Sequence, residues 1–246
     1  MLGAPRFTWN NPLANCELRI ATFASLKRVA PDSPAIAERT LDWLGITALP
    51  ETMDRLERYA AWLVEEAIPA GGLGPREGGR VWGRHVADSL SFAVGWREGV
   101  PPPDLLDVGT GVGLPGIPLA IVWPETHVVL LDRGGRRTRL LERAVRVLGL
   151  ENVVVSQGDA FAVADEWTAV TFRGSVRAPE AVGLSARLLD VPGTAVLGLS
   201  RRIEPPDRTR DLMGVAAALS MEPELVRVPS EILDGPAWLL IMRFSA

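Results

Sequence analysis

The chain has 246 residues, of which 47% are hydrophobic and 23% are charged, and its formal net charge is -4. This composition is that of an ordinary globular protein, and the acidic total excludes a surface that is basic throughout, although it leaves room for one basic patch. The single cysteine, Cys16, excludes an intrachain disulfide framework and an all-cysteine metal site. Residues 1–9 lack the charged-then-apolar order of a signal peptide, and no apolar run approaches the ~20 residues of a membrane span. We therefore expect a soluble, cytoplasmic protein. We also expect no bound metal.

The first hundred residues predict a helical extension. Residues 1–48 are weakly patterned and are expected to form an arm of uncertain structure. Apolar residues recur at helical spacing over 51–68, and a loop rich in glycine and proline over 69–79 precedes a second predicted helix over 81–96. We expect these helices to form a module, residues 49–100, that packs on the rest of the protein.

The pattern changes to alternating strands and helices over residues 101–246. Short apolar runs that predict strands lie at 104–108, 128–131, 153–155, 169–172, 194–199, 224–228 and 238–244. Helical patterns lie between them at 136–148 and 181–189, the first stopped by Gly149. Strands that alternate with helices predict a mostly parallel sheet covered on both faces, and the last two runs are expected to form an antiparallel edge. The fold class predicted is therefore α/β, with a seven-stranded Rossmann-like sheet.

A glycine-rich loop follows the first predicted strand. Gly109, Gly111 and Gly113 lie where that strand turns into a helix, so backbone can approach a ligand that side chains would exclude. Gly111, Gly113 and Gly116 also satisfy the G-x-G-x-x-G dinucleotide pattern. The glycines alone therefore predict a nucleotide cofactor without distinguishing a methyltransferase from a dehydrogenase.

Two acidic residues narrow the choice of cofactor. Asp107 precedes the first glycine by two positions, where a carboxylate favours a cationic amino acid group and repels a pyrophosphate. This favours S-adenosylmethionine. Asp132 ends the second strand, where it can accept both ribose hydroxyls, a role common to both cofactor types.

The end of the third strand adds candidates for the adenine. Asp159 can accept the exocyclic amine and Phe161 can contact the ring, with Ala160 between them. The alternative interpretation is a turn in which Asp159 caps the next helix.

Two stretches, 81–90 (Val-Trp-Gly-Arg-His-Val-Ala-Asp-Ser-Leu) and 106–118 with its Leu-Pro-Gly-Ile-Pro run, resemble the bacterial glucose-inhibited division protein B family. The members of that family are 16S ribosomal RNA guanine-N7 methyltransferases, and the resemblance covers roughly residues 56–199. It implies a Rossmann-like class I methyltransferase fold, S-adenosylmethionine as cofactor, and 16S ribosomal RNA or the 30S subunit as partner. We expect a monomer.

The resemblance also assigns residues to the site. The positions that match the family's cofactor contacts are Gly109, Leu114, Ala160, Phe161 and Arg173. On the substrate side this chain departs from the family: its Ser-Arg-Ala motif reads Phe-Arg-Gly at 172–174, and its late Leu-Lys-Gly reads Leu-Ser-Arg at 199–201. Cofactor binding is therefore better supported by the resemblance than the ribosomal substrate.

Arg173 and His85 are the candidate catalytic residues. Arg173 is expected to orient the cofactor or the guanine, because a guanidinium can bond guanine O6. His85 either forms a wall of the active site or ties its helix to the domain. Arg136, Arg139, Arg143 and Arg146 share one helical face, which either grips phosphates or is simply solvated.

Three functions remain open on the sequence. The first is an RNA guanine-N7 methyltransferase. The second is a small-molecule methyltransferase, favoured if the module before Pro101 seals the site. The third is a non-catalytic paralogue that binds cofactor or RNA, favoured if Trp167, Phe172 or Arg201 plugs the mouth of the site.

Overall fold

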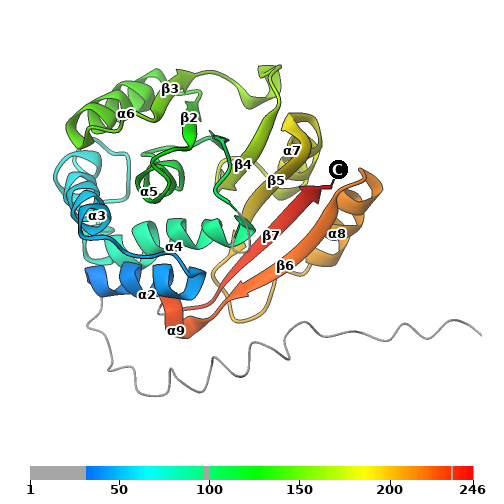
Figure 1. Ribbon diagram of the computed structural model, residues 1–246, viewed down its shortest axis with the longest axis horizontal. Helices are drawn as coiled ribbons and strands as arrows, with labels where there is room; N and C mark the ends of the chain where they lie inside the picture. Colours follow the sequence, from blue (N-terminus) through cyan, green and yellow to red (C-terminus); the bar gives the residue numbers. More distant parts are fainter. Residues whose placement is uncertain (1–31, 97–99, 234, 246) are drawn as a thin grey trace, which may run out of the picture. The chain divides into compact units, whose positions relative to one another are not determined.

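The computed structural model describes residues 32–96, 100–233 and 235–245. Residues 31–246 form one compact unit (Figure 1). The α-helices are α2 (Pro34–Leu44), α3 (Pro50–Trp62), α4 (Ala87–Leu90), α5 (Gly116–Val122), α6 (Gly135–Leu148), α7 (Ala178–Leu188), α8 (Thr209–Ala218) and α9 (Ser230–Leu233). Shorter 3-10 or π turns are η3 (Leu63–Ala67), η4 (Gly78–Arg80), η5 (Trp82–Val86), η6 (Ser91–Trp96) and η7 (Ala160–Ala162). The strands are β1 (Asp104–Val108), β2 (His127–Asp132), β3 (Val153–Gln157), β4 (Trp167–Arg173), β5 (Leu189–Ser200), β6 (Glu222–Val228) and β7 (Ala237–Phe244).

The seven strands form one sheet in the order β3-β2-β1-β4-β5-β7-β6. Neighbours from β3 to β5 pair in parallel, whereas β7 pairs antiparallel with both β5 and β6. The predicted seven-stranded, mostly parallel sheet is therefore confirmed. Of the two strands expected as an antiparallel edge, β7 is the one that runs against the others, and β6 lies outside it.

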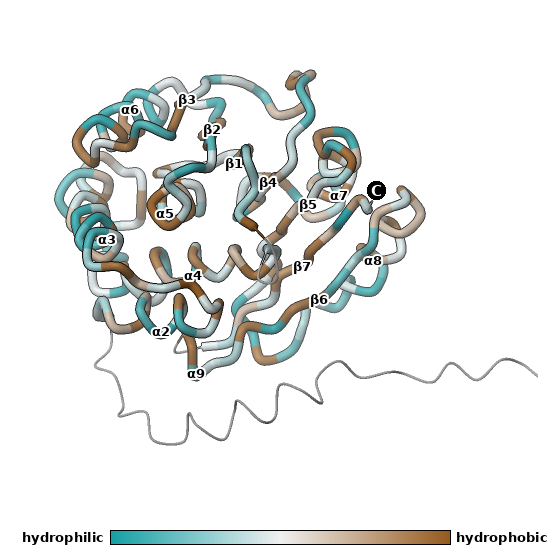
Figure 2. Tube along the Cα trace, viewed as in Figure 1, coloured by the Kyte–Doolittle hydropathy of each residue, from teal (hydrophilic) through white to brown (hydrophobic). Residues whose placement is uncertain are grey.

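Helices cover both faces of the sheet because βαβ connections place them there, and the strands between them are apolar as a result. Figure 1 shows α4 and α5 on one side of the strands and α7 and α8 on the other. Buried Leu184, Leu188 and Leu212 of α7 and α8 pack in one cluster with Phe172 and Leu240 of the strands. Figure 2 shows hydrophobic residues along β5 and β7, while α6 alternates between hydrophilic and hydrophobic faces as its sequence predicts.

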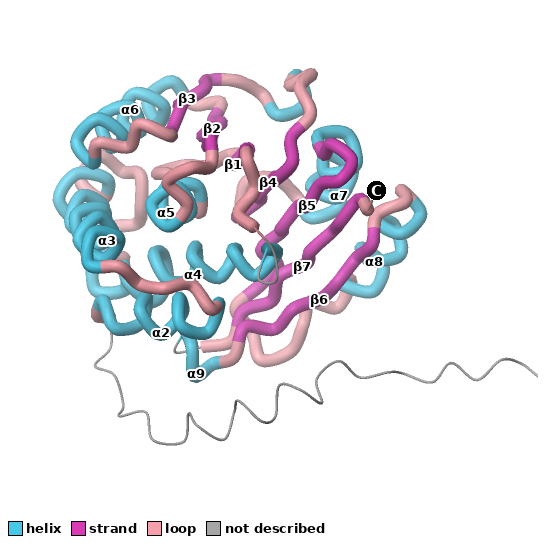
Figure 3. The backbone as a smooth tube through the Cα atoms, in the orientation of Figure 1, coloured by secondary structure: helices cyan, strands magenta, loops and turns pink. Residues whose placement is uncertain are grey.

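The helical extension differs in detail from the prediction. The helix predicted over 51–68 begins at Pro50 and continues beyond Trp62 as the π turn η3. The helix predicted over 81–96 consists of η5, α4 and η6, which Figure 3 shows as one run of helical segments. The hydrophobic pattern predicts where the chain is helical, but the type of turn depends on packing that spacing does not encode.

Part of the expected arm, residues 1–48, belongs to the compact unit. Within the described residues of that range, α2 starts at a proline and ends at Gly45, whose φ of 74° is the left-handed conformation that closes many helices. Its buried Ile36, Leu41 and Leu44 join the core. Nowhere in the described part of the chain is a helix both long and apolar enough to span a membrane.

Candidate functional site

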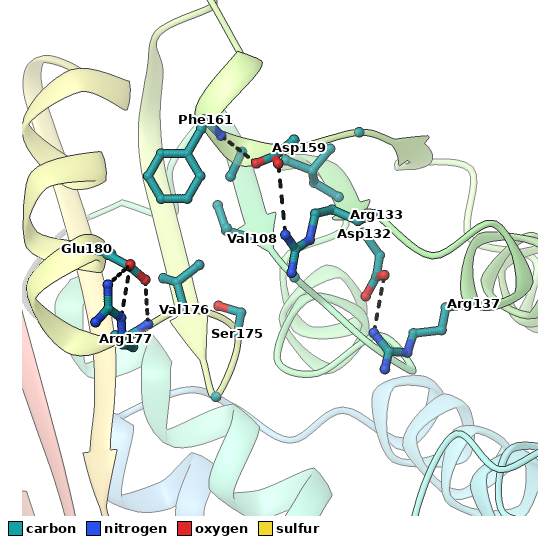
Figure 4. Close-up of a pocket in the computed structure, with 15 residues that line it drawn as sticks. Val108, Asp132, Arg133, Arg137, Asp159, Phe161, Ser175, Val176, Arg177 and Glu180 are labelled. Carbon is teal, nitrogen blue, oxygen red and sulfur yellow. Dashed lines mark hydrogen bonds and ion pairs between the residues drawn. The ribbon is translucent and has the colours of Figure 1, made fainter.

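A cavity of about 650 Å³ opens at the carboxyl ends of β1, β2 and β4. Val108 at the end of β1, Asp132 at the end of β2 and Gly174 after β4 all line it. The chain proceeds from β1 outward to β2 and β3 and then returns to the other side of β1 for β4, so the strand order reverses here. Parallel α/β sheets bind ligands at such a reversal, outside the carboxyl ends of the strands. Figure 4 shows the side chains that surround the cavity.

The glycine loop forms one wall through its backbone. Gly109 lines the cavity with φ of 66°, and a Cβ added there would lie 2.3 Å from the Cβ of Ser175 in the loop after β4. This position therefore accepts only glycine, and the two loops contact each other directly. Gly111 and Gly113 also have positive φ, but they and the buried Leu114 lie outside the residues that line the cavity.

Asp107 lies beneath the loop rather than in the cavity wall. It is fully buried, its Oδ2 accepts a hydrogen bond from the Gly116 amide at 2.8 Å, and its Oδ1 accepts one from the Thr171 hydroxyl at 2.9 Å. Burial raises the pKa of Asp107 from 3.8 to about 6, against the opposing effect of these hydrogen bonds. In this structure Asp107 joins the start of α5 to β1 and β4, and it does not line the cavity expected to hold the cofactor.

Asp132 is held rigidly at the cavity wall. Its Oδ2 accepts a hydrogen bond from the Gly111 amide at 3.1 Å, and its Oδ1 accepts one from the Gly134 amide at 2.8 Å. The guanidinium of Arg137 lies 3.5 Å from Oδ1. A carboxylate has about four acceptor positions, so the two oxygens of Asp132 retain capacity for further donors.

The segment after β3 forms the adjoining wall. Asp159 Oδ1 accepts the Phe161 amide at 3.0 Å and so caps η7, while Oδ2 lies 3.9 Å from the guanidinium of Arg133. Asp159, Ala160 and Phe161 also line the cavity, and the side chain of Phe161 is 57% exposed. Asp159 therefore caps η7, as the alternative interpretation has it, and it also lines the cavity; its contact with adenine stays a prediction.

The segment after β4 forms a further wall of the cavity, which the sequence did not predict. Arg177 and Glu180 line the cavity, and their side chains form a charged hydrogen bond at the start of α7. The Arg177 amide donates to Glu180 Oε2 at 3.2 Å. The residue before α7 is an arginine rather than Ser, Thr, Asp or Asn, so the sequence signature of a capping box does not mark this pair.

Arg173 and His85 lie together in a separate cluster beside the cavity. Arg173 Nε donates to Asp88 Oδ2 at 3.0 Å, and its Nη2 donates to the Arg84 carbonyl at 2.9 Å. His85 Nε2 lies 3.0 Å from Glu77 Oε2. Burial and the nearby Arg173 lower the pKa of His85, which favours a neutral ring. Neither residue lines the cavity, although Arg173 directly precedes Gly174, which does.

The arginine stripe on α6 is partly engaged within the protein. Arg136 Nη2 donates to the Ala70 carbonyl at 2.9 Å, and Arg143 Nη2 donates to Glu66 at 3.1 Å. These two arginines attach α6 to η3 and the loop that follows it. Their contacts reduce the part of the stripe that is available for phosphates. Among the described residues, no three His, Cys, Asp or Glu side chains gather as a metal site would require.

A family model described as rRNA small subunit methyltransferase G matches residues 52–204. The chain belongs to this family. The matched region contains β1 to β4, the glycine loop and every residue that lines the cavity. The residues that match the family model therefore include those that form the cavity.

Curated relatives carry the name ribosomal RNA small subunit methyltransferase G. The protein of Acidothermus cellulolyticus is 38% identical over 144 residues, 58% of this chain and 62% of the relative. That of Thermobifida fusca is 37% identical over 157 residues, 63% of this chain and 65% of the relative. The chain therefore matches less than two thirds of the length of either relative.

Solved structures show the same fold at low sequence identity. A putative O-methyltransferase from Klebsiella pneumoniae aligns with a TM-score of 0.54 and 13% identity, over 86% of this chain and 97% of that one. This likeness shows the Rossmann-like fold of the sheet and its flanking helices.

Proposed function

We propose that this protein is an S-adenosylmethionine-dependent methyltransferase that methylates guanine N7 in small-subunit ribosomal RNA. The observation that carries the proposal is Asp132, whose carboxylate is fixed by two backbone amides at the wall of a cavity beside β1. Membership of the rRNA small subunit methyltransferase G family supports the reaction and the substrate class.

The residues of the cavity fit this cofactor. Its volume of about 650 Å³ lies within the range of small-molecule sites, which is about 300–1,000 Å³. The remaining acceptor positions of Asp132 suit two ribose hydroxyls, and the exposed ring of Phe161 suits contact with adenine. Gly109 lets the loop after β1 pack against Ser175, which also lines the cavity, because any side chain at 109 would meet Ser175. The cofactor supplies an electrophilic methyl group on a sulfonium.

Methyl transfer to guanine N7 does not require acid or base catalysis by the protein. Guanine N7 attacks through a neutral lone pair and has no proton to lose, so transfer needs alignment and exclusion of water rather than a general base. We propose that the Asp88–Arg173 pair positions η5 and α4 beside the loop at Gly174. A neutral His85, held by Glu77, contributes to the same arrangement.

The alternatives receive less support from the cavity. Its lining residues all lie between Val108 and Glu180, so among the described residues none of the helical extension seals it. Phe172 is fully buried in the core, and Trp167 and Arg201 do not line this cavity. An unsealed site suits a base presented by a loop or distorted RNA, because an intact A-form helix hides N7 in its deep groove. A ribosomal substrate implies a cytoplasmic protein.

The test is transfer of labelled methyl from S-adenosylmethionine to 30S subunits that lack N7-methylguanine. We expect labelled N7-methylguanine in the ribosomal RNA with the wild type, its loss with Asp132→Asn, and its retention with Asp165→Asn, which removes an exposed carboxylate outside the cavity. Cofactor binding by the wild type without label in the RNA would contradict the proposed function. Label that appears only in small molecules of a cell extract would indicate a small-molecule acceptor.

A further inference from the structure

A second cavity, of about 330 Å³, lies between the start of α2, the turns η4 and η5, and the segment after β5. Three arginines from two distant parts of the sequence line it. We name it the arginine pocket, and its lining residues are Asp32, Ile36, Gly79, Arg80, Gly83, Arg84, Arg201, Leu233 and Gly235.

The positive charges of this pocket are only partly compensated. Arg80 and Arg84 lie 3.7 and 3.4 Å from the same carboxylate, that of Glu77, and their side chains are 56% and 44% exposed. Glu77 also holds His85 at 3.0 Å. The carboxylate of Glu77 thus interacts with two guanidinium groups and an imidazole. The distances from its oxygens to these groups are longer than those of strong charge-assisted hydrogen bonds.

The third arginine is fixed in the wall. Arg201 Nη1 donates to the Gly83 carbonyl and Nη2 to the Leu233 carbonyl, both at 3.0 Å. Its Nε lies 3.8 Å from Asp88, whose other oxygen accepts from Arg173. Arg201 therefore presents its charge at a defined place, which makes the pocket preorganised for an anion.

Among the described residues that line the pocket, Asp32 is the one carboxylate, and it already accepts hydrogen bonds. Asp32 accepts hydrogen bonds from the amides of Val81, Trp82 and Gly83, at 3.0, 2.7 and 3.1 Å. The oxygens of Asp32 thus bond backbone amides, while three arginines stand against this one carboxylate among the described lining residues.

The arginine pocket lies on the same edge of the sheet as the first cavity. Arg201 follows the carboxyl end of β5, and Arg173 is the last residue of the neighbouring parallel strand β4. Arg173 bonds the backbone of Arg84 in one pocket and directly precedes Gly174 in the wall of the other. Arg173 therefore connects the walls of the two cavities.

We propose that the arginine pocket binds a backbone phosphate of the RNA strand whose guanine enters the first cavity. This inference rests on the proposed function and adds a phosphate subsite to it. The planar guanidinium groups of Arg80 and Arg84 match the oxygens of a phosphate diester. Gly79 leaves room beside them, because a Cβ added there would meet nothing within 4 Å.

The test compares RNA binding by full-length Arg80→Gln, Arg84→Gln and wild-type protein over a series of salt concentrations, with a labelled small-subunit ribosomal RNA transcript as the probe. Each lost phosphate contact lowers the slope of log affinity against log salt by about 0.7–0.9. The expected result is a smaller slope by that amount for each variant, with the affinity for S-adenosylmethionine unchanged. Arg84→Gln retains the backbone carbonyl that accepts from Arg173, so it leaves that contact in place.

Arg210→Gln is the matched control, because it removes one exposed positive charge from α8. Wild-type slopes for Arg80→Gln and Arg84→Gln, or an equal reduction for Arg210→Gln, would overturn the phosphate subsite. Salt-dependent RNA binding that responds to the pocket variants, without methyl transfer by the wild type, would contradict the proposed function and still support the subsite.

Discussion

Asp88 and Arg173 form a salt bridge, with 3.0 Å between Oδ2 and Nε, that joins α4 to the carboxyl end of β4. Their side chains are 11% and 22% exposed, so the pair is largely shielded from water. Removing Arg173 leaves Asp88 with the more distant guanidinium of Arg201, at 3.8 Å, and removing Asp88 leaves Arg173 without this carboxylate.

We expect Arg173→Gln to lower the free energy of unfolding by about 2 kcal/mol, the typical loss for a hydrogen bond to a charged group. Urea unfolding measures this loss. A double-mutant cycle with Asp88→Asn should show coupling, because the two substitutions remove the same interaction. Additive losses would show that the two side chains act independently.

The contact between Gly109 and Ser175 predicts different effects for two neighbouring glycines. Both Gly109 and Gly111 have φ near 65°, but an added Cβ meets Ser175 at Gly109 and nothing within 4 Å at Gly111. Gly111→Ala should therefore lower the free energy of unfolding by only about 1–2 kcal/mol, through backbone strain. Gly109→Ala should cost more and should also weaken cofactor binding. Calorimetric titration with S-adenosylmethionine and urea unfolding measure the two effects, and equal behaviour of both variants would contradict this explanation.

The raised pKa of Asp107 predicts a specific pH dependence of stability. Its pKa in the folded state is about 6, against the ordinary value of 3.8 for an aspartate, so between these values the folded state binds the extra proton. The contribution of Asp107 to the free energy of unfolding therefore falls as pH rises from about 4 to 6, by at most about 1.4 kcal/mol per pH unit. Above pH 6 it is constant.

Asp107→Asn isolates this contribution from those of the other carboxyl groups. Urea unfolding of wild type and variant at pH 4, 5, 6 and 7 should show the wild type losing stability relative to the variant from pH 4 to 6, with little further change to pH 7. A difference in stability that is independent of pH would contradict the raised pKa.

Tyr59 supports the glycine loop from the helical extension. Its buried hydroxyl donates to the Val112 carbonyl at 3.0 Å. We expect Tyr59→Phe to lower the free energy of unfolding by about 1 kcal/mol, since the buried Val112 carbonyl loses its hydrogen-bond donor. The affinity for the cofactor should also fall in this variant, because Val112 belongs to the loop that contains Gly109. Unchanged cofactor affinity in the variant would show that the loop keeps its geometry without this hydrogen bond.

The sheet could be predicted from the sequence because its signals are local. β1 matches the predicted residues 104–108, and α6 starts one residue before the predicted helix and ends with it. Helices α2, α8 and α9 were not predicted. In α8 the buried residues include Leu212 and Ala216 among small neighbours, which gives little amphipathic contrast.

The contacts of the site depend on tertiary structure. A carboxylate at the end of a strand looks the same in sequence whether it faces a ligand, like Asp132, or lies under the start of a helix, like Asp107. Likewise, Arg201 contacts residues 118 and 32 positions away, and no local pattern encodes that pairing.

The acidic residues of the first cavity each face an arginine: Asp132 faces Arg137, Asp159 faces Arg133, and Glu180 faces Arg177. Figure 4 shows these pairs around the opening. The wall thus carries its own counterions and projects little net field into solution. A ligand of this cavity is selected by shape and by individual hydrogen bonds, and long-range attraction of a charged substrate has to originate elsewhere on the molecule.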